Sequence, residues 1–276
     1  MSAIEVKSAR PAGGPSVPYA EAGSPDGIPL VLVHGLGESW WTFEPLLRRL
    51  PASLHGYAPT QRGHGDAARP DGGYAPHDLA DDLVAFLDTL GIGRAVLAGS
   101  STGGVTARIV AGSHPDRVAG LVLMGTPATV DDHPRFQALR DGVRTLEDPV
   151  PRPFVEEQLG GAAARAVGRG FLETMTDEGL KIPARVWRET VGGLMETDLV
   201  ATLRGILVPT LVLWGDEDPF LPAADQQRIL DLVWGSTLIG YDGGGHALHW
   251  EQPERVAQDI AAFAAESAAG GERSST

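Results

Sequence analysis

The sequence predicts an α/β fold with a mostly parallel central sheet flanked by helices. Short apolar runs such as Leu30-Val31-Leu32-Val33 alternate with amphipathic segments along most of the chain. This alternation requires crossover connections, which place parallel strands in one sheet with helices on both faces. Residues 128–203 interrupt it with helix-like patches and no convincing strand, which predicts a helical insertion.

The first half of the chain supplies most of the predicted strands. Residues 1–27 are rich in Pro, Gly, Ala and Ser, and we expect short, irregular or antiparallel edge strands there. The apolar runs predict buried strands, and the apolar stripe of 76–90 predicts an amphipathic helix. In order, the expected elements are a strand at 30–33, helix 41–50, strand 54–58, helix 76–90, strand 95–98, helix 105–111 and strand 118–124.

The second half predicts the insertion and then the end of the sheet. Helical patches lie at 135–146, 154–159, 170–175 and 184–195, followed by a strand at 210–214, helix 223–233, strand 237–239 and helix 253–265. We therefore assign 1–127 and 204–266 to the core and 128–203 to a helical cap. The small polar residues of 267–276 predict a disordered tail.

Composition excludes several functions. The 276 residues are 42% hydrophobic, enough for one large core. The net charge of −14 argues against nucleic acid and against anionic membrane surfaces. The absence of cysteine excludes disulfides and a thiol nucleophile. With no signal-like or membrane-length apolar run, we expect a soluble cytoplasmic protein, although nothing specifies its oligomeric state.

A glycine-flanked serine is the most informative local motif. Gly99-Ser100-Ser101-Thr102-Gly103 follows the strand at 95–98 and precedes the helix at 105–111. A tight strand-to-helix turn with glycines on either side exposes the serine hydroxyl at the carboxyl edge of a sheet. We therefore predict that Ser101 is a nucleophile.

A serine hydroxyl needs a base, and the base needs an orienting group. Two later strands end in suitable residues: Gly215-Asp216-Glu217-Asp218-Pro219 follows 210–214, and Gly243-Gly244-Gly245-His246 follows 237–239. The order Ser, Asp, His is that of one known class of serine hydrolase.

Together these motifs make the chain resemble the α/β-hydrolase fold superfamily. The matching pieces also include His34-Gly35-Leu36-Gly37, Arg62-Gly63-His64-Gly65 and Glu251-Gln252-Pro253-Glu254. The resemblance implies that Ser101 is the nucleophile, His246 the general base and Asp218, rather than Asp216, the orienting carboxylate. It also implies an oxyanion hole formed by the backbone N–H groups of Leu36 and Thr102.

The resemblance implies a bracing role for His34 and a structural loop around His64. The family commonly carries an aspartate near Thr60, so the usual loop contacts are in question here. The chain lacks HExxH, GxGxxG and P-loop patterns, and its other histidines have no ligand spacing, so we predict no metal and no cofactor.

The pocket itself is weakly specified. Aromatic and apolar residues near the oxyanion loop, in the cap and near His246 are candidates to line it, with packing as the alternative for each; they are Trp40, Trp41, Trp187, Met195 and His249. Arg185 and Arg188 could meet an anionic substrate or lie in solvent.

The expected function is hydrolysis of an ester or lactone of a small, mostly apolar molecule through an acyl-enzyme on Ser101. Carbon–carbon bond hydrolysis, cofactor-free perhydrolysis and cyanohydrin cleavage are alternatives on the same triad, because one fold hosts many chemistries. A small-molecule receptor with vestigial activity is the non-enzymatic alternative.

Overall fold

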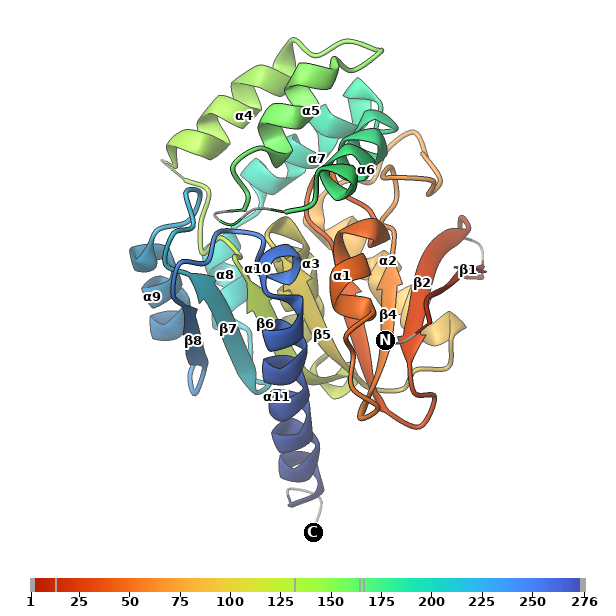
Figure 1. Cartoon of the computed structure of the whole chain (residues 1–276), viewed down its shortest axis with the longest axis vertical. Coiled ribbons are helices and arrows are strands. Elements are labelled where there is room, and N and C mark those ends of the chain that lie inside the picture. Colours follow the sequence, from red (N-terminus) through yellow and green to blue (C-terminus); the bar gives the residue numbers. More distant parts are fainter. Residues whose placement is uncertain (1–2, 13, 132, 164, 166, 274–276) are drawn as a thin grey trace.

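A central eight-stranded sheet organises the described part of the chain (Figure 1). The computed structural model describes residues 3–12, 14–131, 133–163, 165 and 167–273. The strands are β1 (Glu5–Ala9), β2 (Val17–Gly23), β3 (Ile28–Val33), β4 (Leu54–Pro59), β5 (Ala95–Ser100), β6 (Val118–Met124), β7 (Thr210–Gly215) and β8 (Thr237–Tyr241). Their order is β1-β2-β4-β3-β5-β6-β7-β8, with β2 antiparallel to both neighbours and the other pairs parallel.

Side chains of the central strands alternate between two apolar layers. Leu30 and Leu32 of β3 pack on one face, whereas Val31 and Val33 pack on the other. This two-residue period follows from the pleat of a strand, and it explains why buried parallel strands read as continuous apolar runs. The predicted α/β fold with a mostly parallel sheet is therefore confirmed.

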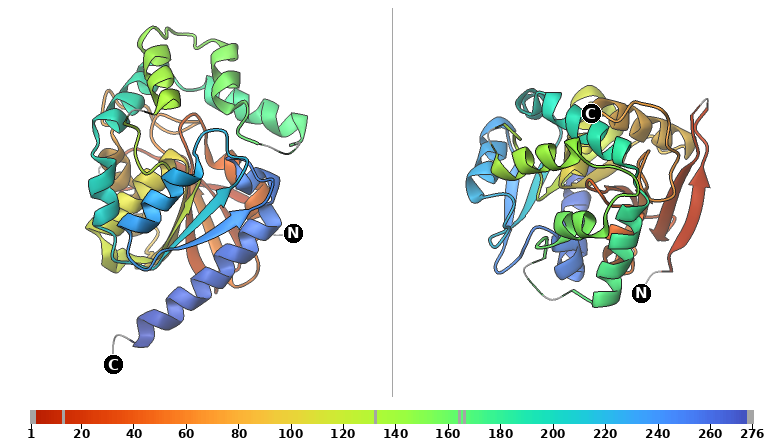
Figure 2. Two further views of the ribbon diagram at one scale, coloured as in Figure 1. Left: turned by 90° about the vertical axis from the view of Figure 1, so that its left-hand side faces the viewer. Right: turned by 90° about the horizontal axis from the view of Figure 1, so that it is seen from above.

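Helices cover both faces (Figure 2). The helices α1 (Glu44–Leu47) and α11 (Pro253–Arg273) pack on one face, and α2 (Pro76–Thr89), α3 (Thr102–Ser113), α8 (Leu199–Arg204) and α9 (Ala223–Leu232) pack on the other. The short elements η1 (Trp40–Phe43), η2 (Pro115–Arg117) and α10 (Leu248–Glu251) precede α1, β6 and α11 respectively.

Four helices lie above the sheet in Figure 1. They are α4 (Pro134–Arg144), α5 (Arg152–Leu159), α6 (Arg169–Leu180) and α7 (Ala184–Glu196). We call these four helices the cap. The sequence did not predict α8, which begins within 128–203 but packs against α3 through hydrogen bonds from Arg108 to Thr202 and Leu199. The assignment of the whole range 128–203 to a cap stays a prediction.

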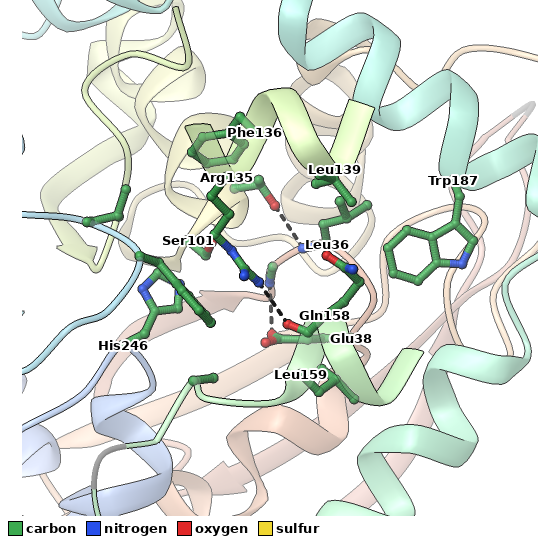
Figure 3. Close-up of a pocket in the computed structure, with 15 residues that line it drawn as sticks. Leu36, Glu38, Ser101, Arg135, Phe136, Leu139, Gln158, Leu159, Trp187 and His246 are labelled. Atoms are coloured by element: carbon green, nitrogen blue, oxygen red, sulfur yellow. Dashed lines mark hydrogen bonds between the residues drawn. The ribbon is translucent and has the colours of Figure 1, made fainter. Parts of the chain in front are cut away.

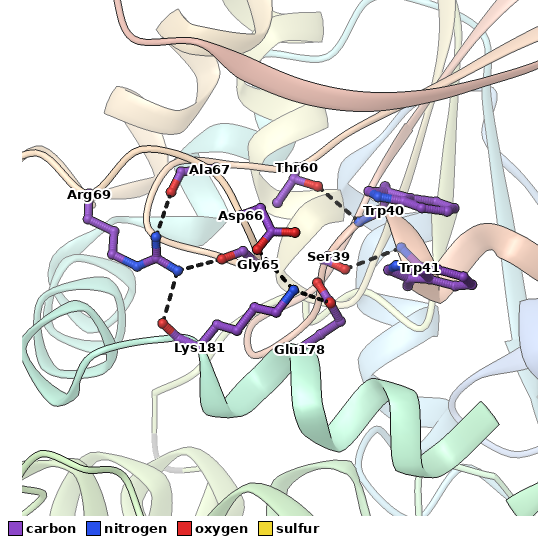
Figure 4. A network of polar contacts seen from close by, with 10 residues as sticks. All are labelled: Ser39, Trp40, Trp41, Thr60, Gly65, Asp66, Ala67, Arg69, Glu178 and Lys181. Carbon is purple, nitrogen blue, oxygen red and sulfur yellow. Dashed lines mark hydrogen bonds and ion pairs between the residues drawn. The ribbon is translucent and has the colours of Figure 1, made fainter. Parts of the chain in front are cut away.

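A polar cluster joins the end of α6 to the loop after β4 (Figure 4). The Lys181 ammonium pairs with Asp66 at 2.9 Å and with Glu178 at 2.6 Å. The Arg69 guanidinium donates to the backbone carbonyl oxygen of Lys181 at 3.0 Å. These contacts fix one end of the cap to the core.

The structure continues α11 to Arg273, over part of the range 267–276 for which the sequence predicts a disordered tail. That disorder stays a prediction. Alanines in the preceding turns favour a helix, because alanine loses no side-chain entropy there. Ser267 is buried against the sheet rather than free in solvent. Residues 274–276 lie outside the described part.

Candidate active site

Ser101 sits at a strained turn between β5 and α3. Its φ of 51° and ψ of −123° make it the one non-glycine residue with positive φ in the described part of the chain. Such backbone strain costs about 1–3 kcal/mol and is concentrated at functional sites. The Ser101 N–H donates to the Met124 carbonyl oxygen at 2.9 Å, which ties the turn to β6.

The flanking glycines make this turn sterically feasible. A Cβ at Gly99 would lie 2.4 Å from Gly104 Cα, and one at Gly103 would lie 2.2 Å from the Val33 carbonyl oxygen. Both distances are far below van der Waals contact, so no other residue fits without moving the backbone. The sequence motif therefore marks a real packing requirement around Ser101.

Asp218 and His246 meet across the ends of β7 and β8. The His246 Nδ1 lies 2.8 Å from Asp218 Oδ2, and the Asp218 side chain is fully buried. The other carboxylate oxygen accepts the backbone N–H groups of Phe220 at 2.8 Å and Leu221 at 3.1 Å. Because Nδ1 faces the carboxylate, Nε2 is the His246 nitrogen left to act in the pocket.

Asp216 makes a different contact. Its carboxylate accepts the backbone N–H of Gly243 at 2.6 Å, on the exposed turn after β8. The carboxylate that contacts His246 is thus the Asp218 carboxylate, and Asp216 caps a turn.

The loop 34–38 approaches Ser101 from β3. His34 is fully buried and contacts the Gly35 carbonyl oxygen through Nδ1 at 2.8 Å. Its Nε2 accepts the Gln61 N–H at 2.9 Å, so His34 links two loops and keeps its proton on Nδ1. Burial lowers the pKa of His34 to about 3. The other bracing contact comes from Thr60, whose hydroxyl accepts the Trp40 N–H at 3.2 Å.

The predicted oxyanion donor on Leu36 is occupied. The Leu36 N–H donates to the Thr102 hydroxyl at 2.8 Å, close to Ser101 (Figure 3). The sequence could not show this contact, because it joins two residues 66 positions apart in the chain. An incoming oxyanion would have to displace the Thr102 hydroxyl from Leu36.

Glu38 is a buried carboxyl group that sequence reasoning missed. It accepts the Gly35 N–H at 3.0 Å and lines the same pocket as Ser101. Burial raises the pKa of Glu38. The signal was available, because Glu38 directly follows the glycine-rich loop.

Ser101 and His246 line one pocket beneath the cap (Figure 3). Core residues form its floor, and α4, α5 and α7 supply residues of its wall. The lining is Gly35, Leu36, Glu38, Ser101, Thr102, Arg135, Phe136, Leu139, Gln158, Leu159, Ala162, Trp187, Phe220, Leu221 and His246. Trp187 is the predicted wall residue that appears in this lining among the described residues.

Four of the predicted wall residues lie elsewhere. Trp40 and Trp41 stack on each other with ring centroids 4.4 Å apart, and Figure 4 shows them side by side. His249 is fully buried, and its Nε2 lies 2.9 Å from the Thr42 hydroxyl. Met195 belongs to α7 and packs, partly buried, against the larger apolar core cluster. All four lie outside the described lining of this pocket, and their role in binding substrate stays a prediction.

Arg185 and Arg188 also lie outside the described lining of this pocket. The Arg185 guanidinium contacts Glu189 at 3.3 Å, and Arg188 donates to the Leu146 carbonyl oxygen. The arginine that does reach the pocket is Arg135 of α4, for which the sequence offered no signal.

Over the described ranges, no group of His, Asp and Glu side chains is arranged to hold a metal ion. In the same ranges, no helix combines the length and apolarity that crossing a bilayer requires.

Comparison with known proteins places this geometry in a family. A profile of the alpha/beta hydrolase family matches residues 30–259. The chain is 30% identical to a non-heme chloroperoxidase of Streptomyces lividans, over 91% of this chain and 96% of the relative. It is 26% identical to 3-oxoadipate enol-lactonase 2 of Acinetobacter baylyi, over 86% of this chain and 88% of the relative.

A solved structure agrees with these relatives. A thermophilic esterase of Thermogutta terrifontis superposes with a TM-score of 0.81 at 25% identity, covering 95% of this chain and 99% of the esterase. The family match at residues 30–259 includes Ser101, Asp218 and His246 and leaves out β1 and β2. The chain therefore belongs to the alpha/beta hydrolase family of enzymes.

Proposed function

We propose that the protein is a serine hydrolase that cleaves a carboxylic ester or lactone of a small molecule through an acyl-enzyme on Ser101. The observation that carries the proposal is the 2.8 Å contact between His246 Nδ1 and the buried Asp218 carboxylate, at a pocket that Ser101 also lines. An oriented imidazole beside a serine is the arrangement that activates a hydroxyl.

In the proposed mechanism, His246 Nε2 removes the Ser101 proton as the serine oxygen attacks the substrate carbonyl carbon. The Asp218 carboxylate holds the Nδ1 proton and stabilises the imidazolium. The backbone N–H groups of Leu36 and Thr102 then bind the oxyanion, after the Thr102 hydroxyl has released Leu36. His246 protonates the leaving alkoxide, and water repeats the cycle on the acyl-enzyme.

The test is the Ser101→Ala variant, with Ser100→Ala as the matched control because Ser100 is the neighbouring buried serine. Turnover of a panel of short-chain esters and lactones should fall by about 10⁴–10⁶-fold in Ser101→Ala. It should stay within a few fold of the wild type in Ser100→Ala. A fluorophosphonate probe should label the wild type and Ser100→Ala but not Ser101→Ala. Wild-type esterase activity in Ser101→Ala would refute the assignment.

Similarity to the chloroperoxidase favours perhydrolysis as a second candidate. In that reaction, hydrogen peroxide replaces water and attacks the acyl-enzyme, which yields a peracid and free Ser101. Adding hydrogen peroxide and bromide to an ester-hydrolysing sample should then give Ser101-dependent bromination of a phenol indicator. Hydrolysis without bromination would exclude this candidate.

A further inference from the structure

The pocket contains a cation that the proposed mechanism does not use. Arg135, near the start of α4, is partly buried and lines the pocket with Ser101 and His246. Figure 3 shows its side chain extending from the cap into the space among the lining residues. Among the described lining residues it is the one arginine or lysine.

Aromatic contacts place this charge beside the reacting groups. The Arg135 guanidinium carbon lies 3.4 Å from the ring centroid of Phe220. The Phe220 ring in turn packs against the His246 ring, with centroids 4.9 Å apart. Since Phe220 also donates its backbone N–H to Asp218, one residue connects the arginine with both proposed catalytic groups.

The guanidinium lacks a carboxylate partner within the described part of the chain. Among the described residues, the Arg135 guanidinium makes one hydrogen bond, from Nη2 to the Gln158 carbonyl oxygen at 3.1 Å. The Asp218 carboxylate is near enough to act on the charge of Arg135, but both its oxygens are engaged by His246 and by backbone N–H groups. Burial lowers the pKa of Arg135, which expresses the cost of desolvating this charge.

Two other arginines with little exposure make more contacts than Arg135 within the described residues. The Arg62 guanidinium forms a two-point ion pair with Asp82, and Arg108 makes three hydrogen bonds to Thr202, Pro127 and Leu199. A partly buried guanidinium that uses one of its five N–H donors can offer the others to a ligand in the pocket. Planar two-point recognition of a carboxylate is the interaction that arginine makes best.

We propose that Arg135 binds a carboxylate group of the substrate, so that the enzyme acts on esters or lactones that also carry an acid. This rests on the proposed function and names its substrate class. The cap wall also includes the apolar residues Phe136, Leu139 and Leu159, which suit a short hydrocarbon spacer between the acid and the scissile bond. Burial raises the pKa of Glu38, which favours its neutral form and reduces repulsion of an anionic substrate.

A structural clamp is the competing explanation. Arg135 stacks on Phe220 and therefore joins α4 of the cap to the loop after β7. A clamp would hold the cap in place for every substrate, whereas a carboxylate receptor would affect only the acidic ones. The two roles therefore separate in a comparison of acidic and neutral substrates of one shape.

The experiment uses the monomethyl esters of succinate, glutarate and adipate, each beside the neutral ester in which a carboxamide replaces the acid. Methanol release gives kcat and KM for the wild type, Arg135→Gln and the control Arg140→Gln. Arg140 lies on the same helix, but it is exposed and pairs with Asp141. Its variant therefore removes an equal charge outside the pocket.

The wild type should prefer at least one acid over its amide by about tenfold or more in kcat/KM. Arg135→Gln should lose about 10–100-fold on that acid, mainly through KM, because a charge-assisted contact made in the ground state is removed. The amide should change by less than about threefold, and Arg140→Gln should match the wild type. Equal losses on acid and amide, or no acid preference in the series, would overturn the proposal.

A binding measurement separates this proposal from the proposed function. In Ser101→Ala, calorimetry should detect binding of the three free dicarboxylates, and Arg135→Gln added to that variant should abolish it. Binding without Ser101-dependent turnover of any ester would refute the hydrolase mechanism and leave the carboxylate site standing. If Arg135→Gln fails to fold, Arg135→Lys keeps the charge but loses the two-point geometry, and an intermediate acid preference is expected.

Discussion

At the scale of single residues, a hydrogen bond between Leu36 and Thr102 joins the loop 34–38 to the start of α3. The Thr102 hydroxyl accepts the Leu36 N–H, while the Thr102 backbone lies at the start of α3 beside Ser101. Thr102 thus supplies one proposed oxyanion donor, its own backbone N–H, while its hydroxyl occupies the other, the Leu36 N–H. In the resting enzyme this satisfies an N–H that would otherwise be unpaired and partly buried.

Replacing Thr102 with valine tests this competition. Thr102→Val keeps the side-chain shape but removes the oxygen that Leu36 must leave, and a neutral hydrogen bond is worth about 0.5–1.5 kcal/mol. We expect kcat/KM for a neutral ester to rise by about two- to tenfold, with Thr102→Ser close to the wild type. A fall in Thr102→Val with normal folding would show that the hydroxyl assists the reaction instead.

At the scale of elements, α3 is held by a buried arginine. Arg108 is fully buried and donates to Thr202 at 2.8 Å, to the Pro127 carbonyl oxygen at 2.7 Å and to the Leu199 carbonyl oxygen at 3.1 Å. It therefore joins α3, whose first turn follows Ser101, to α8 and to the loop after β6. Burial lowers its pKa to about 9.

Removing this side chain should loosen α8. Arg108→Met fills similar space but leaves the buried Pro127 carbonyl oxygen without its donor, whereas the Leu199 carbonyl oxygen keeps the Thr202 hydroxyl. We expect the free energy of unfolding to fall by about 1–3 kcal/mol. Urea denaturation gives the value, with exposed Arg140→Met as the control at less than about 0.5 kcal/mol. A change no larger than that of the control would mean that water replaces the lost contacts.

At the scale of the whole molecule, burial of histidines makes the fold sensitive to acid. Burial lowers the pKa of His34 and of His249 to about 3, and that of His64 to about 4. In the unfolded chain these groups bind protons near pH 6.5. Between those values the unfolded state binds more protons, so stability is present at neutral pH and is lost as the pH falls.

The predicted slope can be measured. Each such histidine contributes about 1.4 kcal/mol per pH unit between its unfolded and folded pKa values. Urea denaturation at pH 7.5, 6 and 5 should therefore show little change above pH 6.5 and a steep loss below it. His64→Gln should flatten that loss. An equal unfolding free energy at pH 7.5 and pH 5 would contradict the assignment of these histidines as neutral.

Local patterns of apolar residues in the sequence predicted most of the helices and strands. The predicted strand at 118–124 has the observed bounds, and the helix predicted at 76–90 ends within a residue of α2. The helix α8 was missed, because six residues carry too little periodicity to identify a helix. The extension of α11 past Ser267 was missed because a small polar composition outweighed the helix propensity of alanine.

In the candidate site, too, the sequence predicted the residues that lie in local motifs and missed those placed by long-range packing. Ser101 lies in one contiguous motif, and Asp218 and His246 follow strands whose carboxyl ends meet at one sheet edge. Trp40 and Trp41 have the same apolar character as a true pocket wall, so sequence cannot distinguish their stacking from that role. Arg135 reaches the pocket from a cap helix whose position depends on long-range packing.

The sequence by itself determined the α/β class, the turn at Ser101 and the order of the proposed triad, because each depends on a local pattern or on strand ends that a parallel sheet must bring together. Only the tertiary structure decided that the Thr102 hydroxyl accepts the Leu36 N–H and that the buried Glu38 lines the same pocket as Ser101. It also decided that Arg135 lacks a carboxylate partner among the described residues. These facts depend on which side chains from separate elements meet in a low-dielectric space. Whether a polar group is buried, and whether it has a partner, depends on how separate segments pack together and not on any one segment.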